Sequence, residues 1–424
     1  MKINIIGGGL AGSEAAYFLA ENGYEVTLYD KKPVLGEAFH TEKFSELVCS
    51  NSLKSMNKDN ACGLLKYEMM KLGSLSMEAA MKFRHPSGQD LVVDREQFSS
   101  YIDSKIRNHK NIKCVSKDVV ELEEGDDVIN IITTGPLTSQ GLLDHLKSKY
   151  FGDMLSFYDA AAPLVYFSSL DTSKMYFKSR YDKGDGKYLN IPLNKEEYLK
   201  LVDDLKSGER VILHDFEHFE GCLPVEVMAS RDVNTLRFGP LKPKGLEQDD
   251  IRPYAVIQLR QDDAAGKLYN IVGFQTNLKF KEQKRIFSSI KGMENVKFAR
   301  FGLMHKNTFI VAPSFLNRDL SLKKNKNVFI AGQFSGVEGY VESAATGLLC
   351  GYYVKQRLEN KDFEPIPLNT MLGSLVNYLV MSSPKHFAPM NATYGILQLE
   401  TRKDKLSIYE DSMEVISKWL EKQN

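Results

Sequence analysis

The sequence predicts an α/β protein, in which a parallel-sheet domain is interrupted by a second, α+β domain. Three observations lead to this fold class. A glycine-rich turn joins a strand to a helix near the N-terminus, a similar turn follows a strand near residue 330, and strand candidates lie between them. We expect residues 1–150 and 301–424 to form the main domain and residues 151–300 to form the inserted one.

The composition is that of an ordinary globular protein. Of 424 residues, 43% are hydrophobic and 26% are charged, which excludes a mostly disordered chain. Lys and Arg together number 55, as do Asp and Glu, so any RNA-binding surface is expected to be a local patch. The first apolar run is too short for a signal peptide, and none reaches the ~20 residues of a membrane span. We therefore expect a cytoplasmic protein without membrane contact.

The N-terminal segment predicts a strand, a turn, a helix and a second strand. Residues 2–6 are apolar and rich in β-branched side chains, and residues 10–20 follow helical periodicity. Residues 25–29, which follow the helix and Gly23, are predicted as the second strand, and the acidic residue Asp30 closes it. This order is that of a βαβ unit.

The turn between the first strand and the helix has the spacing G-x-G-x-x-G. Gly7 permits the tight turn, Gly9 lets a pyrophosphate approach the helix N-terminus, and Gly12 lets helix and strand pack closely. Asp30, at the end of the second strand, is expected to bind ribose hydroxyl groups. This context predicts a Rossmann-type dinucleotide site. Its expected contacts are Gly7, Gly8, Gly9, Leu10, Ala11, Gly12 and Asp30.

A second glycine-rich turn follows the strand predicted over residues 327–331. Residues 343–353 are then predicted as a helix, whose small side chains let it approach a ligand. In flavoproteins with two dinucleotide-binding domains, such a late segment returns to the first domain and holds the ribityl chain and isoalloxazine. The two turns together predict one FAD site, to which this segment contributes Gly332, Gln333 and Gly347.

Further elements are predicted between and after the two turns. An alternating run over residues 127–133 is expected to complete the first part of the main domain. Strands predicted over 163–169, 210–213 and 254–260 belong to the inserted domain. Residues 407–422 have apolar side chains at helical spacing and predict a closing amphipathic helix.

Five scattered cysteines without a CxxC pair indicate neither a zinc site nor a disulfide framework, and we predict no metal site. Cys49 lies in a segment rich in small polar residues, and Cys222 lies in a predicted turn. We expect both thiols to face a cleft, where a lowered pKa or a neighbouring base would make them reactive. Cys114 and Cys350 are assigned to packing, and Cys62 is left unassigned.

Several long blocks of unusual composition run nearly from one end of the chain to the other. They are HTEKFSELVCSNSL (40–53), NACGLLKYEM (60–69), GPLTS (135–139), FEGCLPVEVMA (219–229), FGPLKPKGL (238–246), YAVIQLRQ (254–261), YNIVGFQT (269–276), MHKNTF (304–309) and GQFSGVEGYVESAATG (332–347). These blocks resemble the folate- and FAD-dependent RNA (uracil-5-)-methyltransferases, the TrmFO family. A more distant resemblance links the chain to the MnmG family.

The resemblance implies methylation of uridine at C5 in RNA, with U54 in the tRNA T loop as the expected target. It also implies FAD as the hydride donor, 5,10-methylenetetrahydrofolate as the carbon donor, and NADPH or NADH as the reductant of the flavin. By similarity, Cys222 is the nucleophile that adds to C6 of uracil, and Cys49 is its partner near the flavin. The two cysteine roles can be exchanged.

Departures from the family pattern leave both cysteines and both glycine-rich turns intact. They concern target choice, so the same chemistry on a uridine of 23S ribosomal RNA is the alternative. MnmG is disfavoured, because residues 179–182 are SRYD where that family has a GPRYC-like motif. A non-catalytic FAD- and RNA-binding protein is the alternative from another class. The departing residues are Ile191, Asn277, Phe280, Phe301 and Lys306.

An RNA substrate requires cationic contacts to its phosphates. Two groups of basic side chains are candidates, although residues 281–287 also fit an ordinary charged helix. The oligomeric state is left open. The candidate residues are Lys242 and Lys244 in one group, and Lys279, Lys281, Lys284 and Arg285 in the other.

Overall fold

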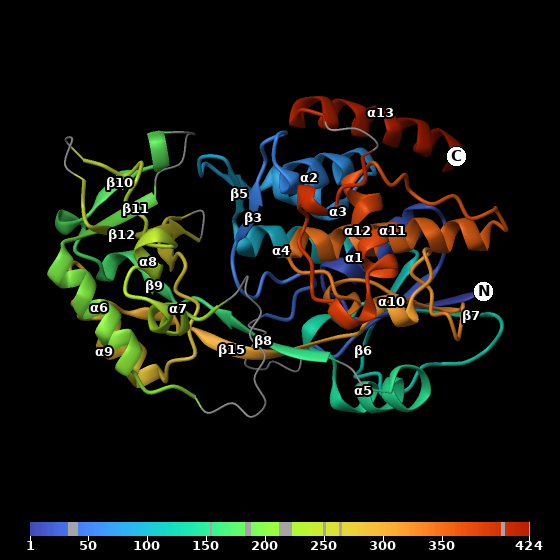
Figure 1. The fold of residues 1–424 in the computed structure, drawn as a ribbon. Helices are drawn as coiled ribbons and strands as arrows, with labels where there is room; N and C mark the ends of the chain where they lie inside the picture. Colours follow the sequence, from blue (N-terminus) through green and yellow to red (C-terminus); the bar gives the residue numbers. More distant parts are fainter. Residues whose placement is uncertain are drawn as a thin grey trace.

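The computed structural model of this chain describes residues 1–32, 41–152, 155–182, 188–211, 223–248, 252–262, 265–399 and 403–423. Figure 1 shows a main part that contains both chain termini, beside a second part formed by the middle of the chain. Two strands, β8 (Leu155–Ala161) and β15 (Leu303–Phe309), run antiparallel between the two parts. The chain leaves the main part along β8 and returns along β15.

The main part is built on a five-stranded parallel sheet with the order β16-β7-β1-β2-β6. Strands β7 and β16 are buried at every position, as expected of parallel strands that are covered on both faces. The sheet joins segments that precede and follow the second part of the molecule in the sequence, because β16 pairs with β7. Its strands are β1 (Lys2–Ile6), β2 (Val26–Asp30), β6 (Ile112–Ser116), β7 (Val128–Ile132) and β16 (Val328–Ile330).

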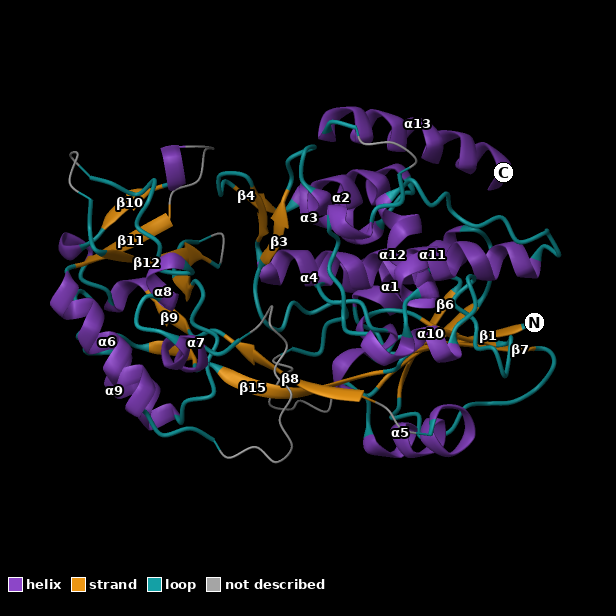
Figure 2. Ribbon diagram, in the orientation of Figure 1, coloured by secondary structure: helices purple, strands orange, loops and turns teal. Residues whose placement is uncertain are grey.

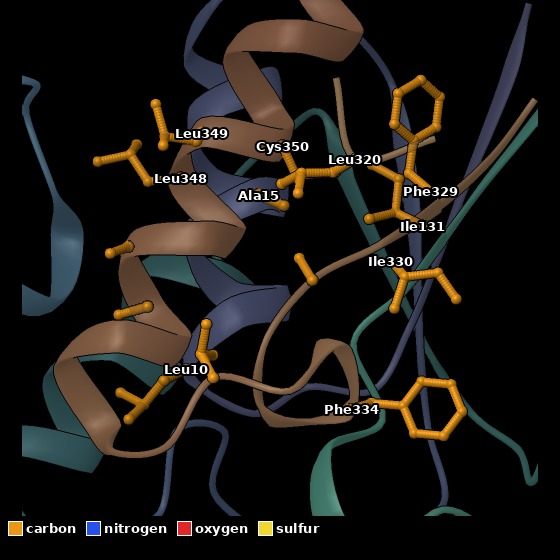
Figure 3. Close-up of a cluster of buried hydrophobic side chains, with 14 of the residues drawn as sticks. Leu10, Ala15, Ile131, Leu320, Phe329, Ile330, Phe334, Leu348, Leu349 and Cys350 are labelled. Carbon is orange, nitrogen blue, oxygen red and sulfur yellow. The ribbon is translucent and has the colours of Figure 1, made fainter. Parts of the chain in front are cut away.

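Two helices form the centre of the apolar core beside this sheet. α1 (Leu10–Glu21) follows β1, and α11 (Tyr340–Leu358) follows β16 and packs along α1. Figure 3 shows side chains of both helices, among them Leu10 and Leu348, in one cluster with Ile131 of β7. Burial of each such side chain stabilises the fold by about 1.5–3 kcal/mol.

The remaining helices of the main part surround this centre. α13 lies on the outside of the molecule against α2, and it buries Ile408, Ile416 and Trp419 (Figure 1). The helices are α2 (Ala61–Lys71), α3 (Leu75–Lys82), α4 (Arg95–Arg107), α5 (Gln140–Leu146), α10 (Ala312–Phe315), α12 (Met371–Met381) and α13 (Lys405–Gln423). A small antiparallel sheet, with the order β3-β5-β4, adjoins α2 and α3; its strands are β3 (Ser52–Ser55), β4 (Arg84–His85) and β5 (Asp90–Val93).

The second part has its own antiparallel sheet and its own core, as Figure 2 shows by the separate group of strands and helices. The sheet has the order β10-β11-β12-β13-β9-β14. Its strands are β9 (Leu164–Tyr166), β10 (Tyr176–Lys178), β11 (Tyr188–Leu193), β12 (Ala255–Gln261), β13 (Leu268–Ile271) and β14 (Phe298–Arg300). The accompanying helices are α6 (Lys195–Ser207), α7 (Val225–Arg231), α8 (Thr235–Phe238) and α9 (Phe280–Phe287).

Most elements expected from the sequence are present, with ends that differ by a few residues. The predicted strand over residues 163–169 is shorter, because residues 167–169 form a 3-10 turn after β9. The strand predicted over 210–213 is reduced, in the described residues, to a single bridge between Arg210 and Leu278; residues 212 and 213 lie outside them. The domain boundaries after residues 150 and 300 stay predictions. Among the described helices, none is long and apolar enough to cross a membrane.

Candidate active site

A cleft opens at the carboxyl ends of β1, β2 and β7, where Rossmann-type folds bind their ligands. Its empty volume is about 1060 Å³, and both glycine-rich turns contribute to its wall. The residues expected to bind a cofactor that do line it are Gly7, Gly8, Gly9, Leu10, Ala11, Asp30, Gly332 and Gln333. The cleft therefore joins the two turns into one site.

The glycines of the first turn have different surroundings. Gly7 has a φ of +107°, a conformation that favours glycine. A Cβ at Gly12 would overlap the carbonyl oxygen of Gly7, so the helix lies directly on the turn. A Cβ at Gly9 would meet nothing within 4 Å. The space beside Gly9 is therefore open to a ligand, whereas Gly12 serves packing.

Helix α1 starts at Leu10 with Gly9 as its N-cap, and among the described residues no side chain caps it. Its first backbone N–H groups and the positive end of the helix dipole therefore face the cleft, which is an arrangement that binds phosphate. The space beside Gly9 gives a pyrophosphate access to these groups. The residues present thus fit the diphosphate of FAD.

Asp30 occupies the position expected for a ribose-binding acid at the end of β2. Its Oδ2 accepts a hydrogen bond of 2.6 Å from the Gly8 N–H, and its Oδ1 accepts one of 2.9 Å from the Lys32 N–H. A carboxylate has about four lone-pair sites, so two backbone bonds leave acceptor capacity for hydroxyl groups. The bond from Gly8 also holds the glycine-rich turn against the end of β2.

Gly347 has a different role from the one expected. It does not line the cleft in the described structure; instead, a Cβ there would overlap the carbonyl oxygen of Ala11 and lie 2.5 Å from its Cα. The small side chain lets α11 approach α1 rather than a ligand. The expectation of a cofactor contact at Gly347 is therefore replaced by helix packing, which supports the cleft from behind.

Cys49 lies beside the cleft, in the loop before β3. The neighbouring residue Val48 lines the cleft, as does Tyr340 at the start of α11. The hydroxyl oxygen of Tyr340 accepts hydrogen bonds from the N–H groups of Cys49, at 2.6 Å, and Ser50, at 3.2 Å. Burial raises the pKa of Tyr340, so the phenol stays neutral. The Cys49 loop is thus tied to the second glycine-rich segment.

The other expected nucleophile, Cys222, lies outside the described residues. Cys350 is fully buried on α11, where Figure 3 shows it inside the apolar cluster, and burial raises the pKa of its thiol. Cys114 lies on β6 and is partly buried against the same core. Both therefore serve packing. Cys62 is half-buried on α2, and its pKa is raised, chiefly by burial.

The basic residues expected to contact RNA lie on the second part of the molecule. Lys242 and Lys244 are exposed on a loop whose carbonyl groups accept hydrogen bonds from Arg180. On α9, Arg285 is already paired with Asp204 and Glu282. Lys279, just before α9, pairs with Glu209, while Lys281 and Lys284 on the helix are exposed. The expectation of a charged helix over residues 281–287 is thus confirmed by α9. The contacts of these basic residues with RNA stay predictions.

Residues 2–362 match the family GIDA, Glucose inhibited division protein A. The chain is also 49% identical over 408 residues to a protein of Listeria monocytogenes serotype 4b (strain F2365), with 95% of this chain and 93% of the relative covered. That relative is named Methylenetetrahydrofolate--tRNA-(uracil-5-)-methyltransferase TrmFO. The chain belongs to the TrmFO group of the GIDA family.

Other TrmFO relatives are similar over nearly the whole chain. The protein of Streptococcus pneumoniae (strain Hungary19A-6) is 47% identical over 425 residues, covering 96% of this chain and 95% of its own. The protein of Bacillus velezensis (strain DSM 23117 / BGSC 10A6 / LMG 26770 / FZB42) is 49% identical over 402 residues, covering 93% and 92%. Both carry the same TrmFO name.

The fold is also that of a solved member of the wider family. Aquifex aeolicus GidA, in its form II crystal, aligns with a TM-score of 0.75 at 17% identity. The alignment covers all of this chain and 73% of the GidA chain. It shows a GidA-like fold with a parallel sheet and an added domain.

Several residues of the TrmFO site were not expected from the sequence. Tyr340 belongs to a block that resembles the family, but no local pattern assigns a contact to its hydroxyl group. Arg95 is the first residue of α4, a helix that Asp94 caps and whose apolar residues are four apart. The four-residue spacing and the capping residue Asp94 could have predicted this helix from the sequence. Neither Arg95 nor Arg300, which both bind the Cys49 loop, has a sequence signal of its own.

Proposed function

We propose that this chain methylates uridine at C5 in RNA, with 5,10-methylenetetrahydrofolate as the carbon donor. The expected target is U54 of the tRNA T loop, the standard TrmFO activity. The observation that carries this function is the 47–49% identity, over nearly the full chain, to relatives named as methylenetetrahydrofolate-dependent tRNA (uracil-5-)-methyltransferases. The geometry of the cleft supports it.

FAD would be held in the cleft between the two glycine-rich turns. The backbone N–H groups at the start of α1 would bind the diphosphate, and Asp30 would accept the ribose hydroxyl groups. Gly332 and Gln333 reach the cleft from the opposite end of the sequence. When bound in its reduced form, FAD supplies the hydride that completes the methyl group.

The chain itself must make C5 of uracil nucleophilic. Addition of a thiolate to C6 forms an S–C6 bond and converts C5 into an enolate carbon, which can attack the methylene carbon of the folate. We assign this thiolate to Cys222 by the resemblance to TrmFO. Cys49, beside the cleft, would then accept the C5 proton, and β-elimination would free the folate and leave an exocyclic methylene on the ring. Once that methylene carbon has gained a hydride, the resulting enolate would expel the Cys222 thiolate from C6, which breaks the S–C6 bond and restores the uracil ring.

The remaining partners follow from this chemistry. The flavin must be reduced again after each turnover, for which NADPH or NADH is the proposed source. The exposed lysines Lys242, Lys244, Lys281 and Lys284 offer charge for RNA phosphates. Such an enzyme would work in the cytoplasm, where its RNA substrate is found.

The function is tested by mapping 5-methyluridine in transfer and ribosomal RNA from a strain in which the gene is deleted. Loss of the T-loop 5-methyluridine is the expected result, and re-expression of the chain should restore it. Loss only at a position of 23S ribosomal RNA would keep the chemistry and change the target. Unchanged 5-methyluridine in both RNA classes would contradict the proposal.

The role of Cys222 has its own test. Purified Cys222→Ala protein should keep its yellow flavin but form no covalent adduct with RNA that contains 5-fluorouridine. Cys350→Ala is the matched control, because that thiol is fully buried in the core. An adduct that persists in Cys222→Ala would remove Cys222 from the nucleophilic role.

A further inference from the structure

Three arginines from separate segments converge on the loop that carries Cys49. Arg95 belongs to α4 of the main part, whereas Arg260 on β12 and Arg300 on β14 belong to the second part. Arg260 donates a hydrogen bond to the Ser50 hydroxyl, at 2.5 Å. The loop is therefore held from both parts of the molecule at once.

Two of the guanidinium groups meet at Cys49 itself. The carbonyl oxygen of Cys49 accepts one hydrogen bond of 3.3 Å from Arg95 and one of 3.0 Å from Arg300. The same side chains also donate to the neighbouring carbonyl groups of Leu47 and Val48, respectively. Two positive charges thus lie within hydrogen-bond distance of one backbone atom of Cys49.

The positive charge at this point exceeds the negative charge paired with it. Among the described residues, the carboxylate that forms an ion pair with these arginines is that of Asp262, which lies 3.0 Å from Arg95 and is 2% exposed. The Nε–H groups of Arg95 and Arg300 are buried, and within the described structure neither has a hydrogen-bond partner. One carboxylate and three guanidinium groups leave the loop with a positive surplus.

Tyr340, whose hydroxyl oxygen accepts the Cys49 N–H bond, does not supply the missing negative charge. Burial raises the pKa of Tyr340, which keeps its phenol neutral. Burial and the nearby Arg95 charge lower the pKa of Arg300. Because guanidinium is effectively always protonated in proteins, Arg300 nevertheless stays charged.

We infer that Arg95 and Arg300 are positioning residues that hold the sulfur of Cys49 as a thiolate next to the cleft. The inference rests on the role proposed for Cys49 above. A thiol loses its proton more readily beside cations, and the thiolate is its reactive form and the one able to accept a proton. The positive surplus on the loop provides such cations, and the thiolate would add negative charge that Asp262 alone does not supply among the described residues.

This arrangement links the reactivity of Cys49 to the seating of the second part. Arg95 reaches the loop from the main part, but Arg300 reaches it only while β14 lies beside the loop. Of the two positive charges at the Cys49 carbonyl oxygen, one is therefore supplied by the second part, which also carries the residues expected to bind RNA. The contribution of Arg300 to Cys49 therefore depends on the contact between β14 and the loop.

The test measures the rate at which iodoacetamide alkylates Cys49 as a function of pH, read by peptide mass in the flavin-bound full chain. An ordinary thiol titrates near pH ~8.5, and a nearby opposite charge moves this midpoint by about 1 or more. We expect a midpoint below about 7.5 in the wild-type protein. A midpoint at or above about 8.5 would overturn the inference without any variant.

Two substitutions separate charge from hydrogen bonding. Arg300→Gln removes the charge and should slow alkylation at pH 7 by about ten-fold, whereas Arg300→Lys keeps the charge and should keep most of the wild-type rate. Arg357→Lys is the control, since Arg357 lies near the C-terminal end of α11, where it donates to the Lys326 carbonyl group, away from the loop. Equal rates in Arg300→Gln and wild type would overturn the inference.

The alkylation assay needs neither RNA nor folate, so it is independent of the proposed function. A shifted midpoint in a protein that methylates no uridine would reject the function and keep the positioning role. Methylation with an unshifted midpoint would do the reverse. In an active enzyme, Arg300→Gln should lower turnover at pH 7 and recover part of it at higher pH.

Discussion

At the scale of single residues, glycines in the turn serve either ligand access or close backbone packing. The G-x-G-x-x-G spacing alone does not show which glycine serves which purpose. Gly9 lies beside open space, whereas Gly12 and Gly347 lie against backbone atoms of Gly7 and Ala11. The first position serves the ligand and the others serve packing. Substitution by alanine therefore separates cofactor binding from stability.

We predict that Gly9→Ala weakens FAD binding by about ten-fold or more, or ~1.4 kcal/mol, because its methyl group occupies the space for the diphosphate. Its backbone, with φ −73° and ψ −170°, suits alanine, so the unfolding free energy of the FAD-free protein should change by less than ~0.5 kcal/mol. Flavin fluorescence titration and urea unfolding measure the two effects. Unchanged FAD affinity would contradict this use of Gly9.

We predict the opposite pattern for Gly347→Ala. The added methyl group meets the backbone of Ala11, which cannot move without separating α11 from α1, so stability should fall by about 1–3 kcal/mol. Gly395→Ala is the matched control, because its Cβ would lie 3.8 Å from Thr393 in ordinary contact. A loss of FAD affinity at unchanged stability would restore Gly347 as a direct cofactor contact.

Residue identity alone predicted the turn and the acid but not the contacts around them. Gly7, Gly9 and Asp30 have roles that follow from local backbone geometry. The spacing of these residues along the sequence is therefore enough to predict them. Tyr340 and Arg300 act on Cys49 from positions distant in the chain, and a single sequence carries no signal for such pairings. The thiol-bearing loop was identified, while the groups that hold it were not.

At the scale of elements, buried carboxylates join helices that are distant in the sequence. Glu68 of α2 accepts hydrogen bonds from the N–H groups of Met371 and Leu372 at the start of α12, both at 2.8 Å. It also accepts one of 2.6 Å from the Ser412 hydroxyl on α13. One side chain thus ties three helices of the main part together.

Burial raises the pKa of Glu68 from 4.5 to about 7, against the opposing effect of its hydrogen bonds. Because the folded state binds this proton more tightly than the unfolded state, the unfolding free energy falls as pH rises from 4.5 to about 7. The contribution is about 3 kcal/mol at most. Glu68→Gln should flatten this part of the curve, measured by urea unfolding at several pH values.

The control for Glu68 is Glu421→Gln, on the exposed side of α13. It should leave the wild-type pH dependence in place. If Glu68→Gln also keeps the full wild-type slope between pH 4.5 and 7, the titrating group is another one. Loss of α13 docking in Glu68→Gln, seen as faster proteolysis after α12, would confirm its role as a tie.

Strands β1, β2, β7 and β16 of the parallel sheet were predictable, because β-rich runs beside glycine turns are typical of such strands. The pairing of β8 with β15 was not, since its two strands are far apart in the chain and join neither main sheet. The small sheet around β5 was also missed. Its strands are only two to four residues long, too short for a periodic signal.

At the scale of the whole molecule, the ion pair between Arg95 and Asp262 joins the main part to the second part. We predict that Asp262→Asn lowers the unfolding free energy by about 3 kcal/mol, because it leaves the Arg95 charge largely buried without its partner. Asp171→Asn, which breaks an exposed pair with Lys174, should have a much smaller effect, because solvent screens that pair. Denaturant unfolding of both variants, each saturated with FAD, measures the two changes in unfolding free energy. Equally small losses in the two variants would show that the Arg95–Asp262 pair does not hold the two parts together.

The place of β16 in the parallel sheet has a consequence for synthesis on the ribosome. Strand β7 emerges early, but its neighbour β16 is translated only after the entire second part. Until then, the nascent N-terminal segment has an unpaired apolar edge and lacks the helix that covers α1. Folding of the earliest residues must therefore wait for the last third of the polypeptide, and a chaperone that shields that edge would raise the yield of native enzyme.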